Sequence, residues 1–364
     1  MADSKKIPLV TVVIPMFNAY PFIGEMLECM EKQTYANWEL IIVDDGSTDE
    51  SIDTVEKYAK KDNRISLIKR PESRKKGGNT CRNIGLENAN GEYIIWFDAD
   101  DLIAHYCLEQ RVSFIENNPN IDIAIAPLIG FRLSPYDKIK FCTGLYPRRG
   151  IIRKFMANTL YFVVVTNIYR VNSLRTKSIT WDEDLKSHQD ADMNLECIYN
   201  NLRFASIIDA KADYFWRIVE NSNSVSKKIY TKSHLETNIY YFNKQVERFG
   251  SNKRDNKHLY LLVNYILKIL IFQPEVSFVK KFVSQPYFKK HKWLAIRLKV
   301  IDKFQHIFNF KTHIPTNLLT FLLCPFFEIN YRLEIANAKR FQRRFANKLI
   351  SNREKSLDHC TIDA

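Results

Sequence analysis

Short apolar runs alternate with amphipathic stretches over the first 130 residues of the chain. After the first run, Phe22, Ile23, Met26, Leu27 and Met30 recur at helical spacing and so share one face. The pattern predicts strands at residues 9–14, 39–43, 65–68, 92–97 and 121–126, with helices between them, as at 51–61, 80–89 and 104–117. Strands that alternate with helices of this length are typical of βαβ units. We therefore expect an α/β fold with a mostly parallel central sheet.

The pattern becomes irregular after residue 130. We expect strands at 161–169, 204–208 and 214–218, and a helix at 190–200. From residue 227 onward the chain reads as helices, at 234–249 and 257–271, followed by a basic and aromatic stretch that reaches residue 353.

Net charge divides the chain near Ser226. The whole chain carries 54 Lys and Arg against 41 Asp and Glu. Residues 227–364 hold 26 of these cations and 10 of these anions, a net charge of +16, which leaves a net charge of −3 for residues 1–226. We expect one domain at 1–226, with halves at 1–130 and 131–226, and a basic, mainly helical region at 227–364.

Cysteine usage and hydropathy suggest a cytoplasmic protein. The 7 cysteines are scattered and form no CxxC pair, which argues against a disulfide framework or a zinc site. The first residues do not resemble a signal peptide, and the longest apolar window, 318–329, is too short to span a membrane. With 46% hydrophobic and 26% charged residues, the composition is that of an ordinary globular protein.

Three carboxylates directly follow the apolar run 93–97. Asp98, Asp100 and Asp101 would stand at the carboxyl end of a buried strand, where open α/β sheets bind their ligands. Crowded carboxylates repel one another unless a cation lies between them, and hard oxygen ligands suit Mg²⁺ or Mn²⁺. Taken alone, the same residues also fit an Asp-rich turn or a helix cap.

The first turn after a strand has no glycine triplet and no Walker-type lysine. Residues 15–18 are Pro, Met, Phe and Asn, which argues against a dinucleotide fingerprint or a P-loop. If the sheet binds a nucleotide, a metal ion must neutralise the diphosphate, and Asp98 and Asp100 are its natural ligands. Asp45, after the second strand, can accept from a nucleobase N–H, although residues 44–49 also fit an Asp-Gly turn that caps a helix.

Glycines and cations precede the helix predicted near residue 80. In the segment 74–83, backbone donors, the helix dipole and Arg82 can together receive an anion. A flexible, solvated basic loop is the alternative, mainly for residues 74–76.

Four stretches in order, 12–18, 41–49, 82–85 and 91–101, resemble family 2 glycosyltransferases, enzymes with the Rossmann-like GT-A fold. The resemblance covers residues 8–226. It implies that the nucleotide lies near Pro15, Phe17 and Asn18, and that Asp45 contacts uracil. The resemblance makes Arg82 a base or phosphate contact. It makes Asp98 a ribose and metal contact and Asp100 the main metal ligand of a DXD motif.

The family also carries a Glu-Asp pair in the acceptor half, whose Asp acts as catalytic base. Here Asp190 matches that Asp, while Gln189 replaces the Glu. His188 and Asp192 leave a second assignment open, and a helix N-cap is the alternative role for Asp190. The segment 215–217 resembles the family's aromatic-Arg segment, which implies that Arg217 approaches the diphosphate.

The resemblance implies an inverting, metal-dependent transfer of one sugar from a nucleotide-sugar, with UDP as the expected nucleotide and Mn²⁺ or Mg²⁺ as the metal. The acceptor would be a hydroxyl of a glycan or lipid-linked glycan in bacterial cell-surface polysaccharide synthesis, such as capsule or O-antigen.

One alternative is a nucleotidyltransferase that acts on sugar phosphates, although such enzymes usually carry a Gly-rich basic loop after the first strand. Another is a non-enzymatic, basic nucleic-acid binder. We expect no nucleic-acid partner, and the oligomeric state stays open.

Basic clusters with interleaved aromatic residues, at 289–293 and 339–345, mark the region 227–364. Such clusters can lie on an anionic leaflet, which would place the chain on the inner face of the plasma membrane. The alternative is a helical bundle that packs on the catalytic domain or on a second subunit. Sedimentation with anionic liposomes at low and high salt separates the two roles.

Overall fold

The computed structural model describes residues 7–132, 142–143, 150–157, 162–207, 210–218, 231–251, 258–271 and 281–291, together with Ala336 and Arg340. A seven-stranded sheet in the order β10-β6-β9-β4-β1-β2-β3 forms its centre. Neighbours in this sheet run parallel except at β9, which is antiparallel to β4 and β6. The strands are β1 (Val10–Met16), β2 (Trp38–Asp44), β3 (Ile65–Lys69), β4 (Tyr93–Trp96), β6 (Ile123–Ile125), β9 (Asn167–Arg170) and β10 (Phe204–Ser206).

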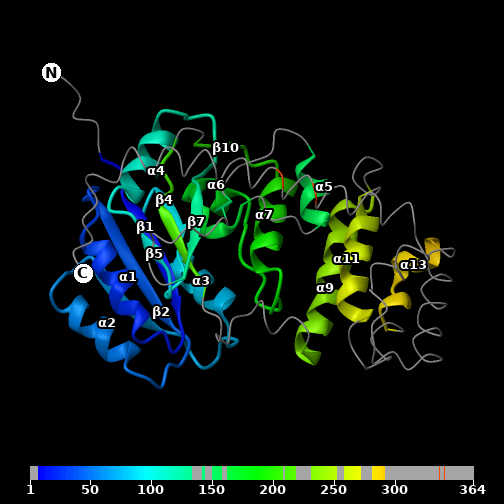
Figure 1. Cartoon of the computed structure of the whole chain (residues 1–364), viewed down its shortest axis with the longest axis horizontal. Helices are drawn as coiled ribbons and strands as arrows, with labels where there is room; N and C mark the ends of the chain where they lie inside the picture. Colours follow the sequence, from blue (N-terminus) through cyan, green and yellow to red (C-terminus); the bar gives the residue numbers. More distant parts are fainter. Residues whose placement is uncertain are drawn as a thin grey trace.

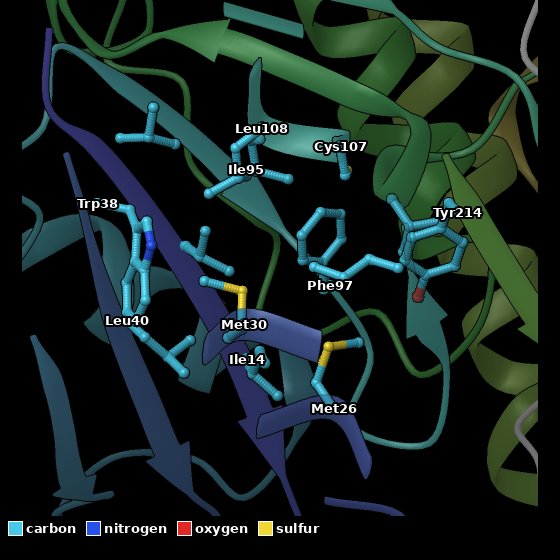
Figure 2. Packing of buried hydrophobic residues seen from close by; sticks show 14 of the residues in the cluster. Ile14, Met26, Met30, Trp38, Leu40, Ile95, Phe97, Cys107, Leu108 and Tyr214 are labelled. Atoms are coloured by element: carbon cyan, nitrogen blue, oxygen red, sulfur yellow. The ribbon is translucent and has the colours of Figure 1, made fainter. Parts of the chain in front are cut away.

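Helices cover both faces of this sheet, because alternate residues of each buried strand point to opposite sides. On one face, Ile14, Leu40 and Ile95 pack against helices α1 (Phe22–Glu31), α2 (Ser51–Ala59) and α4 (Cys107–Glu116). Figure 2 shows Met26 and Met30 of α1 within this cluster. On the other face, strand residues such as Val13 and Trp96 pack against α3 (Gly78–Glu87), α6 (Val171–Thr176) and α7 (Gln189–Tyr199). The predicted α/β class with a mostly parallel central sheet is confirmed.

A smaller, four-stranded sheet has the order β5-β11-β7-β8. Its strands are β5 (Leu102–Ile103), β11 (Tyr214–Arg217), β7 (Leu128–Phe131) and β8 (Cys142–Thr143). Two predictions from the sequence were wrong here. The helix expected from residue 104 begins at Cys107, because residues 102–103 pair with β11. The strand expected at 161–169 contains the 3-10 turn η1 (Val164–Thr166), so β9 begins only at Asn167.

The helices expected after residue 227 are confirmed where the structure describes them. They are α9 (Lys232–Phe249), α11 (Leu259–Ile271) and the short α13 (Pro286–Lys290). Figure 1 shows α9 and α11 side by side, next to α7 and to α5 (Ile151–Met156). One apolar cluster joins Leu195 of α7 to Phe242 of α9 and Leu262 of α11. These helices therefore pack directly on the sheet-bearing part of the chain.

Much of the region 227–364 lies outside the described residues, including the cluster at 339–345 apart from Arg340. The proposed boundary near Ser226 and the proposed membrane contact therefore stay predictions. In the part of the chain that the structure describes, no helix is long and apolar enough to cross a bilayer.

A glycine in α3 allows this helix to lie directly on β1. A Cβ built at Gly85 would come 2.2 Å from Cγ1 of Val13, which is fully buried. This close approach brings the first turns of α3, and Arg82 with them, to the end of the sheet.

We predict that Gly85→Ala lowers the free energy of unfolding by about 1–3 kcal/mol, because the added methyl overpacks the core against Val13. Gly24→Ala in α1 is the matched control, since its Cβ would meet only Thr54 Cγ2 at 3.8 Å. The control should be neutral or more stable by up to about 1 kcal/mol from helix propensity. Urea denaturation of both variants measures the difference, and equal midpoints would contradict the prediction.

Candidate active site

The carboxyl ends of β1, β2 and β4 meet at one edge of the central sheet. Met16 at the end of β1 pairs with Asp44 at the end of β2, and Val13 pairs with Trp96 of β4. The parallel register therefore brings the segments 16–18, 44–49 and 97–101 together. This is the edge at which open α/β sheets bind ligands.

The turn after β1 is fixed by the segment that follows β2. Asn18 adopts a left-handed conformation, with φ of 47°. Its Oδ1 accepts from the backbone N–H of Thr48 at 2.8 Å, while its own N–H donates to Ser47 Oγ at 2.9 Å. Phe17 is 48% exposed, and Lys76 Nζ lies 4.1 Å from the centre of its ring. Pro15, placed in the turn by the sequence, belongs instead to β1, where it pairs with Val43.

Asp44 and Asp45 differ in what their carboxylates contact. Asp44 folds the turn, because its oxygens accept from the backbone N–H groups of Gly46 and Ser47. Asp45 is buried and accepts from Arg70 Nε at 2.5 Å through Oδ1. Sequence reasoning missed Arg70, although its position directly after β3, the neighbour of β2, was a usable signal.

Arg82 lies at the centre of the site. Its guanidinium donates to Asp98 Oδ1 at 3.0 Å and to Gln189 Oε1 at 3.4 Å, and it lies 4.7 Å from the centre of the Trp181 ring. It therefore connects the carboxylates after β4 with the start of α7.

The three carboxylates after β4 have different environments. Asp101 is buried and accepts from Tyr214 O–H at 2.6 Å and from the backbone N–H of Arg217 at 2.7 Å. Asp98 is half-exposed, and the side chain of Asp100 receives, among described residues, only its own backbone amide. Burial of the Asp100 carboxyl and the neighbouring charge of Asp98 raise the pKa of Asp100 to about 6.

Asp101 therefore stabilises the fold, whereas Asp98 and Asp100 have oxygens available for a ligand. Among the described residues, no group of three His, Cys, Asp or Glu side chains could hold a metal ion. A metal ion here would therefore have two protein carboxylates at most and would need oxygens from its ligand.

Arg217 lies beside these carboxylates, but its guanidinium already has partners. It donates to the backbone carbonyl of Asp100 at 2.8 Å and to Glu25 at 2.6 Å. The rings of Phe22 and Phe131 lie 4.7 and 4.8 Å from it. The expected contact with a diphosphate stays a prediction.

Asp190 lies in the first turn of α7 on the side of the site. The cap position is His188, so the alternative role of Asp190 as a helix N-cap is wrong. Its Oδ2 accepts from the backbone N–H of Val164 at 3.4 Å. Burial raises the pKa of Asp190 to about 6, with Arg82 opposing this shift and Asp98 adding to it.

Asp192, the competing candidate for a base, is buried, and both of its oxygens accept from side chains of α9. Its Oδ1 accepts from Gln245 at 3.0 Å and Arg248 at 2.5 Å, and its Oδ2 accepts from Lys244 at 2.9 Å. This geometry favours Asp190 for the role.

The sequence and the fold were compared with known proteins. The model of Glycosyl transferase family 2 matches residues 11–180. An uncharacterised glycosyltransferase of Haemophilus influenzae is 41% identical over 112 residues, which are 30% of this chain and 44% of that protein. Poly(ribitol-phosphate) beta-N-acetylglucosaminyltransferase TarS of Staphylococcus aureus is 29% identical over 210 residues, 56% of this chain and 35% of TarS. The chain thus spans less than half the length of these two relatives.

Solved structures of glycosyltransferases share the fold. A crystal structure of residues 1–349 of S. aureus TarS superposes with a TM-score of 0.60 at 21% identity, over 80% of this chain and 87% of that chain. The same TarS segment in complex with UDP-GlcNAc gives a TM-score of 0.57 at 21% identity, over 93% and 91%. The mannosyltransferase PcManGT of Pyrobaculum calidifontis, in complex with GDP-Man and Mn²⁺, gives 0.50 at 16% identity, over 84% and 89%. Residues 11–180 thus match glycosyltransferase family 2, and the fold is the GT-A fold of the glycosyltransferases.

Proposed function

We propose that the chain transfers one sugar from a nucleotide-sugar, with a UDP-sugar as the expected donor, to a hydroxyl of a glycan or lipid-linked glycan. The observation that carries the proposal is the meeting of Asp45, Asp98, Asp100 and Asp190 around one sheet edge. Related proteins support it, since TarS is named an N-acetylglucosaminyltransferase and its structure has been solved with UDP-GlcNAc.

The carboxylates of Asp98 and Asp100 fit a divalent metal ion. Asp98 is half-exposed and Asp100 has an exposed surface, both supply hard oxygen ligands, and Asp100 has no cationic side chain bonded to its carboxylate among the described residues. The structure of PcManGT, which shares the fold, was solved with Mn²⁺ and GDP-Man, and this supports a divalent metal ion in the proposed reaction. When bound, Mn²⁺ or Mg²⁺ would offset negative charge on the diphosphate leaving group.

The nucleotide would lie along the ends of β1 and β2. The exposed ring of Phe17 offers a stacking surface, and Asn18 shapes the turn beneath it, after Pro15 of β1. Asp45 can accept from the imide N–H of uracil with Oδ2, because Arg70 engages only Oδ1. Arg82 and Arg217 would place positive charge beside the diphosphate.

Asp190 would take the proton of the acceptor hydroxyl as its oxygen attacks the anomeric carbon. Its carboxylate has one weak backbone donor and faces Arg82, so it can hold a proton during the step. One displacement with no carboxylate nucleophile inverts the anomeric centre. We assign the reaction to cell-surface polysaccharide synthesis, such as capsule or O-antigen, at the cytoplasmic face of the membrane. The nucleotidyltransferase alternative is less well supported, since the loop after β1 lacks the glycines of that class.

A donor screen tests this proposal. Family 2 enzymes that act on a nucleotide-sugar should hydrolyse it slowly without an acceptor, so we expect release of UDP from one UDP-sugar with Mn²⁺ or Mg²⁺ and none with EDTA. Release of pyrophosphate from a nucleoside triphosphate and a sugar phosphate would instead support the nucleotidyltransferase. Retention on heparin or DNA, with no retention on a UDP matrix, would support the nucleic-acid binder.

A further inference from the structure

We propose that α9 positions the catalytic base: through Lys244, Gln245 and Arg248 it holds Asp192 and thereby fixes the first turn of α7, which carries Asp190. The inference rests on the proposed function for the role of Asp190. The region after residue 226 would then help to position the catalytic base, in addition to any contact with an acceptor or a membrane.

Helical geometry separates the two faces of α7. Side chains four residues apart share a face, so His188 at the cap, Asp192 and Glu196 align along one side. At about 100° per residue, Asp190 points about 160° away from that side. The side of α7 that carries Asp192 therefore faces α9. Asp190 points the other way, toward Val164, Arg82 and Asp98 in the site.

Each of the three aligned residues is bonded to α9. His188 Nε2 lies 2.5 Å from Asn238 Oδ1, and its ring stacks on Tyr241 with centres 4.6 Å apart. Asp192 receives the three donors of α9 already described, and Glu196 pairs with Arg248. These contacts fix both the rotation of α7 and its position along its own axis.

Lys244 also holds the segment that leads into α7. Its ammonium pairs with Asp182 as well as Asp192, and Tyr240 O–H donates to Asp182 at 3.0 Å. The same segment reaches the nucleotide side, since Asn79 of α3 donates to the backbone carbonyl of Asp182 at 2.6 Å. One lysine of α9 thus connects both ends of the chain segment 182–192.

The apolar contacts between α7 and α9 bring the helices together, but they do not by themselves fix the rotation of α7, because hydrophobic contact is non-directional. A buried carboxylate with three donors is directional, and a buried charge is costly unless its partners stay in place. Small displacements of a reacting group can cost up to about 10²-fold in rate. The side chains of α9 that bond Asp192 are therefore positioning residues, since none of them touches the site itself.

Lys244→Met is the test, with Lys281→Met as its matched control. Lys281 also pairs with a carboxylate of α9, Glu236 at 3.2 Å, but both side chains are exposed and neither contacts α7. In Lys244→Met, Asp192 keeps Gln245 and Arg248, so the chain should fold, which circular dichroism checks. We expect kcat for transfer to fall about tenfold while the KM for donor stays within about twofold. Lys244→Arg should restore kcat, and Lys281→Met should match the wild type.

Hydrogen exchange supplies a readout that does not depend on activity. Amides of residues 186–192 should exchange faster in Lys244→Met than in the wild type and Lys281→Met, because the first turn of α7 opens more often. Unchanged exchange in this segment would overturn the proposal, as would an unchanged kcat or an equal fall of kcat in Lys281→Met. Absence of transfer by the wild-type chain would overturn the proposed function, whatever the exchange result.

Discussion

Asp190→Asn should lower the rate of sugar transfer about 10²–10⁴-fold, the usual effect of removing a positioned general base. Binding of the nucleotide-sugar should stay within a few-fold, because Asp190 lies in α7 and the nucleotide is expected along β1 and β2. Asn keeps an oxygen that can accept from the backbone N–H of Val164, so the local fold should persist. Transfer kinetics and calorimetry of donor binding measure the two quantities separately.

Asp184→Asn is the matched control for this substitution. Asp184 lies a few residues before α7, is exposed, and pairs with Lys75 at the surface. The same change of carboxylate to amide there should leave transfer unchanged. If Asp192→Asn lost transfer with an intact fold while Asp190→Asn did not, the base would be assigned to the wrong residue.

The pH dependence of the wild type follows from the same carboxyl group. The pKa of Asp190 is raised to about 6 by burial, opposed by Arg82 and increased by Asp98. A base acts in its ionised form, so kcat/KM should rise with pH, reach half of its limiting value near pH 6 and level off at higher pH. The profile should be measured in saturating Mn²⁺, because a bound cation keeps Asp100 ionised and removes its titration from this range. The remaining activity of Asp190→Asn should lack this rise.

The strand ends of the site could be predicted because their signals are local. An apolar run followed by carboxylates identifies β4 and Asp98, and parallel pairing then requires that the ends of β1 and β2 lie beside them. Asp100 and Asp101 show the limit of this reasoning. Both residues follow the same strand. The structural role of Asp101 becomes visible only in its tertiary contact with Tyr214, 113 residues later in the chain.

Polar contacts between residues far apart in the chain could not be predicted from the sequence. Arg248 and Asp192 are separated by 56 residues, and Arg70 and Asp45 by 25, with no periodic pattern that links either pair. For the same reason, Asp190 and Asp192 looked equivalent in the sequence, since both lie in the first turn of one helix. The α9 residues that surround Asp192 distinguish them. Even β5 was missed, because two residues are too few to show the alternation that identifies a strand.

Asp100→Asn should weaken UDP binding in Mn²⁺ by about tenfold or more, which corresponds to about 1.4 kcal/mol or more. Burial and, after it, the neighbouring charge of Asp98 raise the pKa of Asp100, and a bound cation would oppose both effects. The amide lacks the charge that a divalent ion needs, so the metal and the diphosphate it neutralises should both bind more weakly. Asp53→Asn on the exposed face of α2 is the matched control and should bind UDP as the wild type does.

Chelation separates loss of the metal from a general defect of the site. In EDTA the wild type should bind UDP as weakly as Asp100→Asn does, and adding EDTA to the variant should change little, because the variant has already lost the metal-dependent part of the affinity. Isothermal titration calorimetry of both proteins, with and without Mn²⁺, gives the four affinities of this cycle. Equal affinity of the wild type for UDP in Mn²⁺ and in EDTA would contradict the assignment of Asp100. It would leave Arg82 and Arg217, the two guanidinium groups beside these carboxylates, to neutralise the diphosphate.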